Sequence, residues 1–175
     1  MTNRKAMRAY WSDGSTRSNH ARSLPSGTRL APLQGMRPIT VSELMTAGVV
    51  TVPDDATLSN VDWEMALADV RHVPVVDGKG RLCGIVSDRD LLRSMNRAHR
   101  GQVPVSQVMT VHVMTARPET PAREALEQLL ARKVSALVVI DDDQLPVGIV
   151  TATDFLDLAF RALSGLPIDA PRAEA

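Results

Sequence analysis

The sequence predicts a mixed α/β (α+β) fold in which two β-α-β-β-α repeats pack sheet to sheet with pseudo-twofold symmetry. Three observations predict it: an internal repeat, β-branched runs of strand length, and helical apolar faces between those runs. The chain has 175 residues, of which 44% are hydrophobic and 3% aromatic. This composition supports an aliphatic core. It argues against a single-stranded nucleic-acid platform, because such a platform needs stacked rings.

The internal repeat has a constant offset of 64 residues. At this offset, residues 41–93 align with residues 105–157 without a gap, and 14 of the 53 positions are identical. Chance would give about 3 or 4 identities. A unit of about 50 residues is marginal by itself, so two units are expected to bury a common core. The identities concentrate in Val41–Thr46 with Val105–Thr110, and in Gly84–Asp90 with Gly148–Asp154.

Repeat one contains runs typical of strands and helices in alternation. The β-branched run Val49–Val52 predicts a strand, and Asp54–Thr57 offers a cap for the helix that follows. Val73–Val76 and Leu82–Val86 flank a turn at Asp77-Gly78, so they are expected to form an antiparallel hairpin. The first helix is expected to bury Leu58, Val61, Met65 and Ala68, and a second helix from about Asp88 carries apolar Leu91, Leu92 and Met95.

Repeat two predicts the same order. Its first strand is Val113–Ala116, and its first helix starts with Pro121 at the first helical position. The hairpin strands are Leu137–Ile140 and Pro146–Val150, and the last helix runs from about Thr153 to Leu163. Phe155, Leu158, Ala159 and Leu163 form an apolar stripe on this helix, of which part is expected to pack internally and part to serve a dimer.

The repeats divide the chain into four parts: a disordered basic head at 1–40, repeat one at 41–100, repeat two at 101–164 and a disordered tail at 165–175. The head has seven basic residues against one acidic residue. Three interpretations of the head stay open: a leader that precedes a true start at Met36, a basic tail that touches an acidic partner or nucleic acid, and a transit peptide. Whether residues 1–35 belong to the native protein is therefore left open.

Several classes of protein are excluded by what the sequence lacks. Cys83 is the single cysteine, so an internal disulfide and a cysteine zinc site are excluded, and a buried, inert thiol in a reducing compartment is expected. The histidines have no metal-binding spacing, and Asp88 with Asp90 has no accompanying base or nucleophile. No apolar run approaches 18 residues. We therefore expect a cytoplasmic, non-enzymatic protein with no metal and no membrane contact.

The repeated motifs resemble those of the cystathionine-β-synthase (CBS) domain, here as a stand-alone tandem pair. The resemblance rests on Val41–Thr46 with its copy, on the strand His72–Asp77, and on Gly84–Asp90 with its copy. It covers about 41–160. It implies a regulatory module that binds an adenine nucleotide or adenosyl ligand in the cleft between repeats and signals through a conformational or dimer change. It also implies a homodimer that forms through helices.

The resemblance assigns a role to each residue of the two clefts. Asp90 and Asp154 would hold ribose, Ser87 and Thr151 ribose or phosphate, and Pro74 and Val138 the base. Arg71, His72 and Arg89 would neutralise phosphate in repeat one, where repeat two has Ser135, Ala136 and Thr153. Repeat one is therefore expected to hold the phosphate-bearing ligand. The backbone contacts to adenine would come from Val49, Val50 and Thr51 and from Val113, Met114 and Thr115.

A ligand-free explanation of the same motif stays open. Ser87 or Thr151, with an aspartate three residues later, also describes a helix capping box. Nothing in the sequence indicates that a cofactor is required. The candidate ligands are AMP, ADP, ATP, S-adenosylmethionine, NAD-type ligands and cyclic dinucleotides, and energy sensing is one possible role. The alternatives are a dimeric adaptor with vacant clefts that docks an unknown protein partner and, less favoured, nucleic-acid contact through the head.

Overall fold

The computed structural model describes residues 38–94 and 102–167, which belong to one compact unit, 37–175. Head residues 1–37, Met95 and tail residues 168–175 lie outside the described residues, and so do the expectations placed on them. The first repeat contains η1 (Val41–Glu43), β1 (Thr46–Ala47), β2 (Val52–Pro53), α1 (Leu58–Leu67), β3 (His72–Val76), β4 (Leu82–Ser87) and α2 (Asp88–Arg93). The second contains η3 (Val105–Gln107), β5 (Thr115–Ala116), α3 (Ala122–Arg132), β6 (Ala136–Ile140), β7 (Pro146–Thr151) and α4 (Ala152–Leu163).

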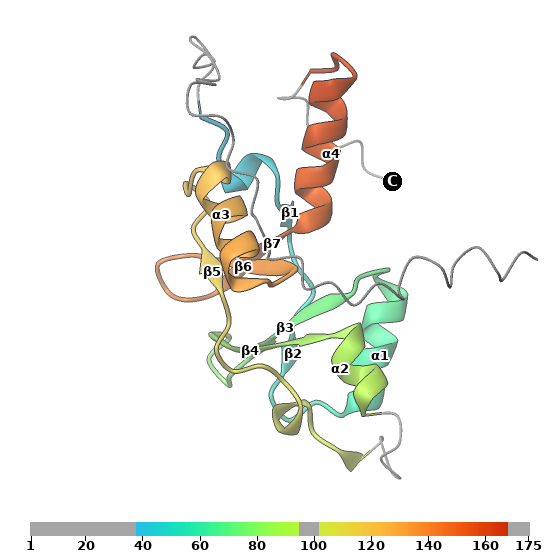
Figure 1. Ribbon diagram of the computed structural model, residues 1–175. Coiled ribbons are helices and arrows are strands. Elements are labelled where there is room, and N and C mark those ends of the chain that lie inside the picture. Colours follow the sequence, from blue (N-terminus) through green and yellow to red (C-terminus); the bar gives the residue numbers. More distant parts are fainter. Residues whose placement is uncertain (1–37, 95–101, 168–175) are drawn as a thin grey trace, which may run out of the picture. The chain divides into compact units, whose positions relative to one another are not determined.

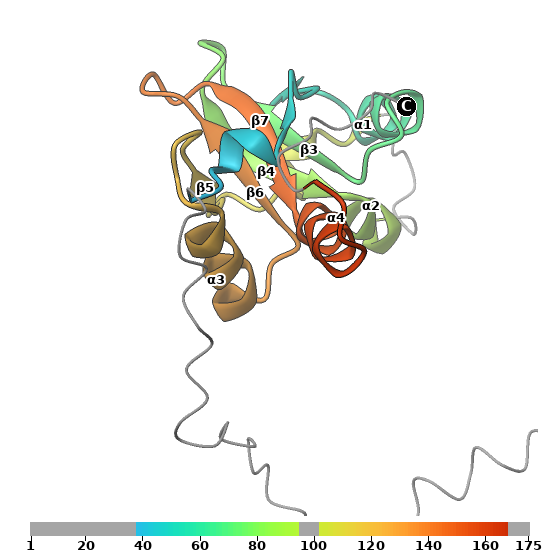
Figure 2. The ribbon, with the colours of Figure 1, turned by 90° about the horizontal axis from the view of Figure 1, so that it is seen from above.

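The strands form two sheets, which confirms the predicted mixed α/β fold. One sheet has the order β2-β3-β4, and the other has the order β1-β7-β6-β5. In both, the predicted hairpin is antiparallel, and the first strand of the repeat pairs parallel to the second. Figure 1 shows α1 and α2 together beside the β3–β4 hairpin, and they contact each other. Helices α3 and α4 contact β6 and β7 respectively, and Figure 2 shows them from above.

The two repeats have the same backbone at the 64-residue offset. Val52 lies opposite Val75 in repeat one, and Ala116 lies opposite Val139 in repeat two. The register of each hairpin shifts at one position, between Val75 and Val76 and between Val139 and Ile140. Two pairs of left-handed residues correspond, Asp69 with Lys133 and Gly80 with Gln144, whereas left-handed Gly48 has no left-handed counterpart at His112. The internal repeat in the sequence is therefore a repeat of register, irregularities and turn geometry.

The leading segments of the two repeats exchange places. We call residues 39–47 arm one and residues 103–110 arm two. Arm one adds β1 to the sheet of repeat two, where Thr46 lies opposite Ile149 and Ala47 opposite Gly148. Arm two makes the corresponding bridge between Thr110 and Ile85 of repeat one. The backbone bonds reciprocate as well: Ala122 N donates to Ile39 O at 2.8 Å and Leu58 N donates to Val103 O at 3.0 Å.

The exchange produces two hydrophobic cores, which corrects the expectation of one common core. The repeat-one core contains Leu58, Val61, Val73 and Val86 together with Val105 from arm two. The repeat-two core contains Ala125, Leu137, Val139 and Val150 together with Val41 from arm one. Val41 and Val105 are both fully buried. Each core is completed by a valine from the other repeat.

Several boundaries and faces differ from the predictions. The first strands are only Val52–Pro53 and Thr115–Ala116, because the residues before them cross from one sheet to the other. Pro121 caps α3 and precedes its first helical residue. Ala68 lies beyond α1 as its C-cap and is exposed. On the last helix, Phe155 is buried and Ala159 and Leu163 are exposed, as the expectation of a partly packed stripe allows.

None of the helices in the described ranges has the length and apolar character that crossing a bilayer requires.

The exchanged valines give a test of the two-core arrangement. We expect Val105→Ala to lower the free energy of unfolding by roughly 1–3 kcal/mol, since it opens a cavity in a closed core. Hydrogen exchange should then lose protection in α1 and β3 of repeat one, although residue 105 belongs to repeat two. Val41→Ala should instead reduce the protection of α3 and β6 in repeat two. Val111→Ala, at a residue that is 57% exposed, is the control; equal loss in both repeats from each core variant would contradict the arrangement.

Candidate functional site

Each repeat places its motif aspartate at the start of a helix, where it forms a capping box. In repeat one, Asp90 Oδ2 accepts from Ser87 N at 3.0 Å and from Ser87 Oγ at 2.7 Å. In repeat two, Asp154 Oδ2 accepts from Thr151 N at 2.6 Å and from Thr151 Oγ1 at 2.9 Å. The structure thus shows the ligand-free explanation of the motif in both repeats.

The two aspartates differ in their accessibility. The Asp90 side chain is 21% exposed, and its other oxygen, Oδ1, lies 3.7 Å from Arg93 NH1. Arg93 is itself largely exposed, so this ion pair is weak. Asp154 is only 5% exposed. A ligand therefore has easier access to the carboxylate of repeat one.

His72 joins the two repeats at the start of β3. It lies opposite Ser87 in the hairpin, and its Nε2 is 2.9 Å from the Oγ of Ser135, immediately before β6. Burial lowers the pKa of His72, and the carboxylates of Asp88 and Asp90 oppose this shift in part, whereas Arg89 and Arg71 add to it. His72 is therefore neutral near pH 7. This contact between repeats was not predicted, because nothing in the local sequence pattern pairs residues 72 and 135.

The predicted adenine-contacting segments cross between the two sheets. Residues 48–51 connect β1, in the sheet of repeat two, to β2, in the sheet of repeat one. Gly48, with φ of 68°, makes the turn, and Val49 and Val50 are half-buried while Thr51 is exposed. Residues 111–114 make the reciprocal crossing, and Val113, Met114 and Thr115 at its end are all half-buried.

One backbone bond distinguishes the two crossings. In repeat two, Val138 N donates to Met114 O at 3.1 Å. The corresponding pair in repeat one is Pro74 and Val50. Because proline has no N–H group, the Val50 carbonyl cannot receive this bond. Repeat one therefore lacks the sheet bond that occupies the corresponding carbonyl in repeat two.

The remaining predicted site residues divide by exposure. Pro74 and Val138 are fully buried in β3 and β6, so a ligand base can reach them only at an edge. Arg71, Arg89 and Thr153 are exposed. The Arg71 carbonyl accepts from Asp88 N at 3.0 Å, which ties the start of β3 to the start of α2. The repeat-one residues from β3 and α2 are thus held together, with both arginine side chains in solvent.

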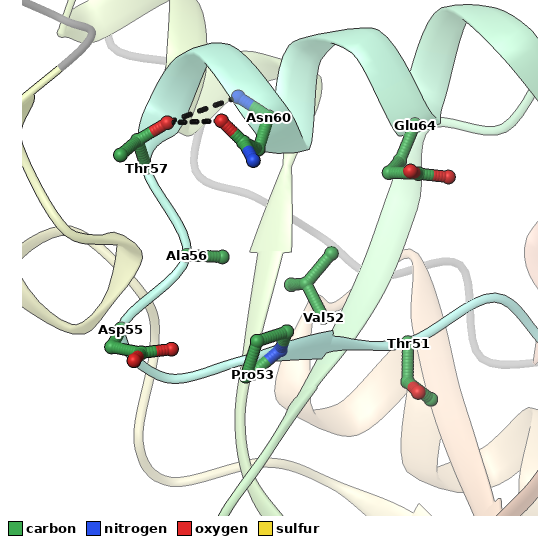
Figure 3. Close-up of a pocket in the computed structure, with 8 residues that line it drawn as sticks. All are labelled: Thr51, Val52, Pro53, Asp55, Ala56, Thr57, Asn60 and Glu64. Carbon is green, nitrogen blue, oxygen red and sulfur yellow. Dashed lines mark hydrogen bonds between the residues drawn. The ribbon is translucent and has the colours of Figure 1, made fainter.

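A cavity of about 370 Å³ lies elsewhere, beside β2 and the first turns of α1 (Figure 3). Thr51 is the residue that it shares with the predicted site. Thr57 Oγ1 and Asn60 Oδ1 are 2.5 Å apart on its wall. Its charged lining is acidic, from Asp55 and Glu64, so it is not suited to a phosphate.

Metal and thiol chemistry have little support in the described part of the chain. Within 38–94 and 102–167, no three His, Cys, Asp or Glu side chains gather closely enough to hold a metal ion. Cys83 is half-buried, and its Sγ donates to Val75 O at 3.4 Å. Burial raises the pKa of the Cys83 thiol, so the reactive thiolate is disfavoured.

Comparisons with known proteins agree on the family and the fold. The CBS domain model matches residues 41–97 and 105–161. The CBS domain-containing protein YhcV of Bacillus subtilis is 32% identical over 115 residues, which are 65% of this chain and 81% of YhcV. Three longer curated relatives are enzymes, and the match covers only 22–31% of their length.

Solved structures show the same architecture. A putative acetoin utilization protein, AcuB, from Vibrio cholerae is 32% identical with a TM-score of 0.65, and the match covers 73% of this chain and 95% of AcuB. CBSX2, solved in complex with AMP, is 26% identical with a TM-score of 0.62, and the match covers 71% of this chain and 98% of CBSX2. These similarities describe the fold of the chain, and AMP is the ligand of CBSX2.

The buried imidazole of His72 predicts a pH dependence of stability. In the unfolded chain His72 has a pKa near 6.5, and in the folded chain its pKa is lower. Below about pH 6.5 the unfolded state therefore binds a proton that the folded state does not, so stability falls as the pH drops through this value.

We expect His72→Gln, whose amide can still bond to Ser135 but does not titrate, to flatten the melting temperature between pH 7 and pH 5. His112→Gln, at an exposed position, is the matched control. Identical pH profiles for wild type and His72→Gln would contradict the assignment.

Proposed function

Because the chain belongs to the CBS domain family, as a pair of such domains, we propose that it is a non-enzymatic regulatory module that binds an adenine nucleotide or adenosyl ligand. The ligand would occupy the repeat-one cleft, between the crossing segment 48–51 and the start of α2. Binding of AMP by the related CBSX2 supports this ligand class. We expect no other cofactor to be required. AMP, ADP, ATP and S-adenosylmethionine are the candidates, with energy sensing as one use.

The observation that carries the proposal is the polar asymmetry of the two repeats. Repeat one combines the Val50 carbonyl, which β3 cannot satisfy at position 74, with the accessible Asp90 carboxylate. A carbonyl acceptor suits the amino group of adenine, and a carboxylate suits the ribose diol. Exposed Arg71 and Arg89 add positive charge for phosphate. In repeat two, position 138 supplies its own N–H donor and Asp154 is buried.

Signalling would follow from where the ligand-contacting backbone lies. Val49–Thr51 connects a strand of one sheet to a strand of the other. A ligand that holds this crossing favours one relative arrangement of the sheets over others. A ligand shifts a conformational equilibrium only if it binds one state of the protein more tightly than the other. The preference for one arrangement of the sheets would supply this difference in affinity. The regulated protein partner and the sign of the regulation are not specified by these features.

Adenine nucleotide binding can be measured by calorimetry with AMP, ATP and S-adenosylmethionine. We expect at least one ligand to bind, and the Arg71→Ala, Arg89→Ala double variant to weaken a phosphate-bearing ligand by roughly tenfold or more, because charge-assisted bonds are lost. The matched control in repeat two is Thr153→Ala, which corresponds to Arg89→Ala and should leave the affinity unchanged.

Asp90→Ala should also abolish binding, but it removes a helix cap as well. Ser87→Ala disrupts the same cap and keeps the carboxylate, so its affinity separates the two effects. The absence of binding by every ligand would favour the adaptor alternative, which the capping boxes allow. The basic head, the basis of the nucleic-acid alternative, lies outside the described residues for most of its length.

We also propose that the chain forms a homodimer through exposed apolar helix surfaces. On α4, Leu156, Phe160 and Leu163 are 69%, 63% and 89% exposed at helical spacing, so they make one apolar stripe. On α1, Trp63 and Leu67 are also largely exposed. Stripes of this kind on a small protein mark association surfaces. In such a dimer, helices of both repeats would contact the second copy. A change in the angle between the repeats would therefore alter the dimer contact.

Light scattering after size-exclusion chromatography tests this interface. We expect a dimer for wild type and a shift to monomer for Phe160→Asp, because a carboxylate on the stripe would be buried without a partner. Val111→Asp, at an exposed apolar residue outside the helices, is the control and should remain dimeric. A monomeric wild type over micromolar concentrations would refute the dimer without affecting the ligand proposal.

A further inference from the structure

Two glycines of the hairpins are covered closely by methionines. A Cβ atom added at Gly148 of β7 would lie 2.5 Å from Met45 Sδ and 3.2 Å from Met45 Cγ. A Cβ atom at Gly84 of β4 would lie 2.9 Å from Met109 Cγ, with the sulfur nearer still. Neither glycine has a left-handed φ. Glycine is therefore required at these positions for the space that the methionine occupies, and not for its backbone freedom.

Both contacts join an arm to the sheet of the opposite repeat. Met45 belongs to arm one and packs against the core of repeat two. Met109 belongs to arm two and packs against the core of repeat one. Each methionine thus sits beside the short backbone pairing that fastens its arm, Ala47 with Gly148 and Thr110 with Ile85. Buried Val41 and the backbone bonds at 39–42 hold the beginning of arm one, whereas the Met45 contact lies at its end, next to the crossing.

Arm one leads directly into the predicted repeat-one cleft. After Ala47, which lies opposite Gly148, Gly48 N donates to Val147 O at 3.3 Å. Residues 49–51 follow, and Val52 is already paired with Val75 in the other sheet. The crossing is held at both ends and contains few residues, so a shift of arm one along β7 displaces the Val50 carbonyl.

We propose that the Met45–Gly148 contact positions the crossing segment 48–51, so that a glycine of repeat two sets the ligand affinity of the cleft in repeat one. The inference rests on the proposed function for its ligand, but the placement of the crossing is independent of any ligand. Met45 and Gly148 are positioning residues, because they act through the backbone of arm one.

The two glycines give a matched pair of variants. At Gly148 an added Cβ would also meet the backbone carbonyl oxygen of Thr46 at 3.0 Å, so arm one itself must move. At Gly84 the three nearest atoms belong to Met109, and they include its Cγ at 2.9 Å and its Cβ at 3.3 Å, so arm two must yield there. Gly148→Ala should therefore displace arm one, whereas Gly84→Ala, at the same strand position of the other repeat, should displace arm two, which leads into the crossing 111–114 instead.

The test uses the full chain, with AMP as the probe ligand and hydrogen exchange as the second readout. We expect Gly148→Ala to weaken AMP binding by about tenfold or more and to speed exchange of the amides at 46–51 relative to those of β3. Gly84→Ala should change the affinity by less than about threefold. Met45→Ala, which removes the side chain without a clash, should speed the same amides even if Gly148→Ala folds poorly.

The two readouts separate the positioning role from the proposed function. If wild type binds no AMP, the proposed ligand fails, and the exchange of 46–51 still decides the positioning role. Unchanged exchange of 46–51 in both Gly148→Ala and Met45→Ala would overturn the proposal. So would an AMP affinity that Gly84→Ala lowers as much as Gly148→Ala does. Partial recovery of affinity in the Gly148→Ala, Met45→Ala double variant would support it, because the side-chain clash is then removed.

Discussion

The exchange of arms between the two repeats is the constraint on which the rest of the structure depends. Val41 and Val105 are fully buried, each in the core of the opposite repeat. Burying a valine contributes about 1.5–3 kcal/mol, a large share of what a unit of about 50 residues can accumulate alone. The pair is therefore expected to fold as one cooperative unit. Exchange also forces the backbone of residues 48–51 and 111–114 to pass from sheet to sheet.

The backbone is symmetric, and the side chains make the two halves unequal. The hairpin registers, their irregularities and two of the left-handed turns repeat at the 64-residue offset. Among the many differences between the repeats, a few lie around the clefts, such as Pro74 against Val138 and His72 against Ala136. Proline removes one backbone donor, and histidine adds a contact to Ser135. Duplication thus explains the fold, whereas substitutions at these few positions account for the functional proposal.

The sequence predicted the hairpins and helices well, because β-branched runs, turn residues and caps are local signals. It predicted the first strands poorly. Val49–Val52 has strand composition, but Gly48 and the crossing between sheets leave only Val52–Pro53 paired. Arm exchange and the His72–Ser135 contact are long-range, and no local periodicity encodes them. Some motif residues that the sequence assigned to one site lie close together in the structure, as His72 opposite Ser87 shows. The sequence could not decide whether Asp90 caps a helix, and its hydrogen bonds to Ser87 show that it does.

The capping box and a ligand at Asp90 are compatible, because a carboxylate has two oxygens. Oδ2 is held by Ser87, which fixes the side chain in one rotamer, and Oδ1 lies 3.7 Å from NH1 of the exposed Arg93. A ribose hydroxyl that replaced so weak an ion pair would lose little and would find its acceptor already oriented. Asp154 has the same cap but is nearly inaccessible. In the proposed function, the same local interaction orients Asp90 for a ligand, whereas the buried Asp154 serves as a cap, so the two clefts are expected to differ.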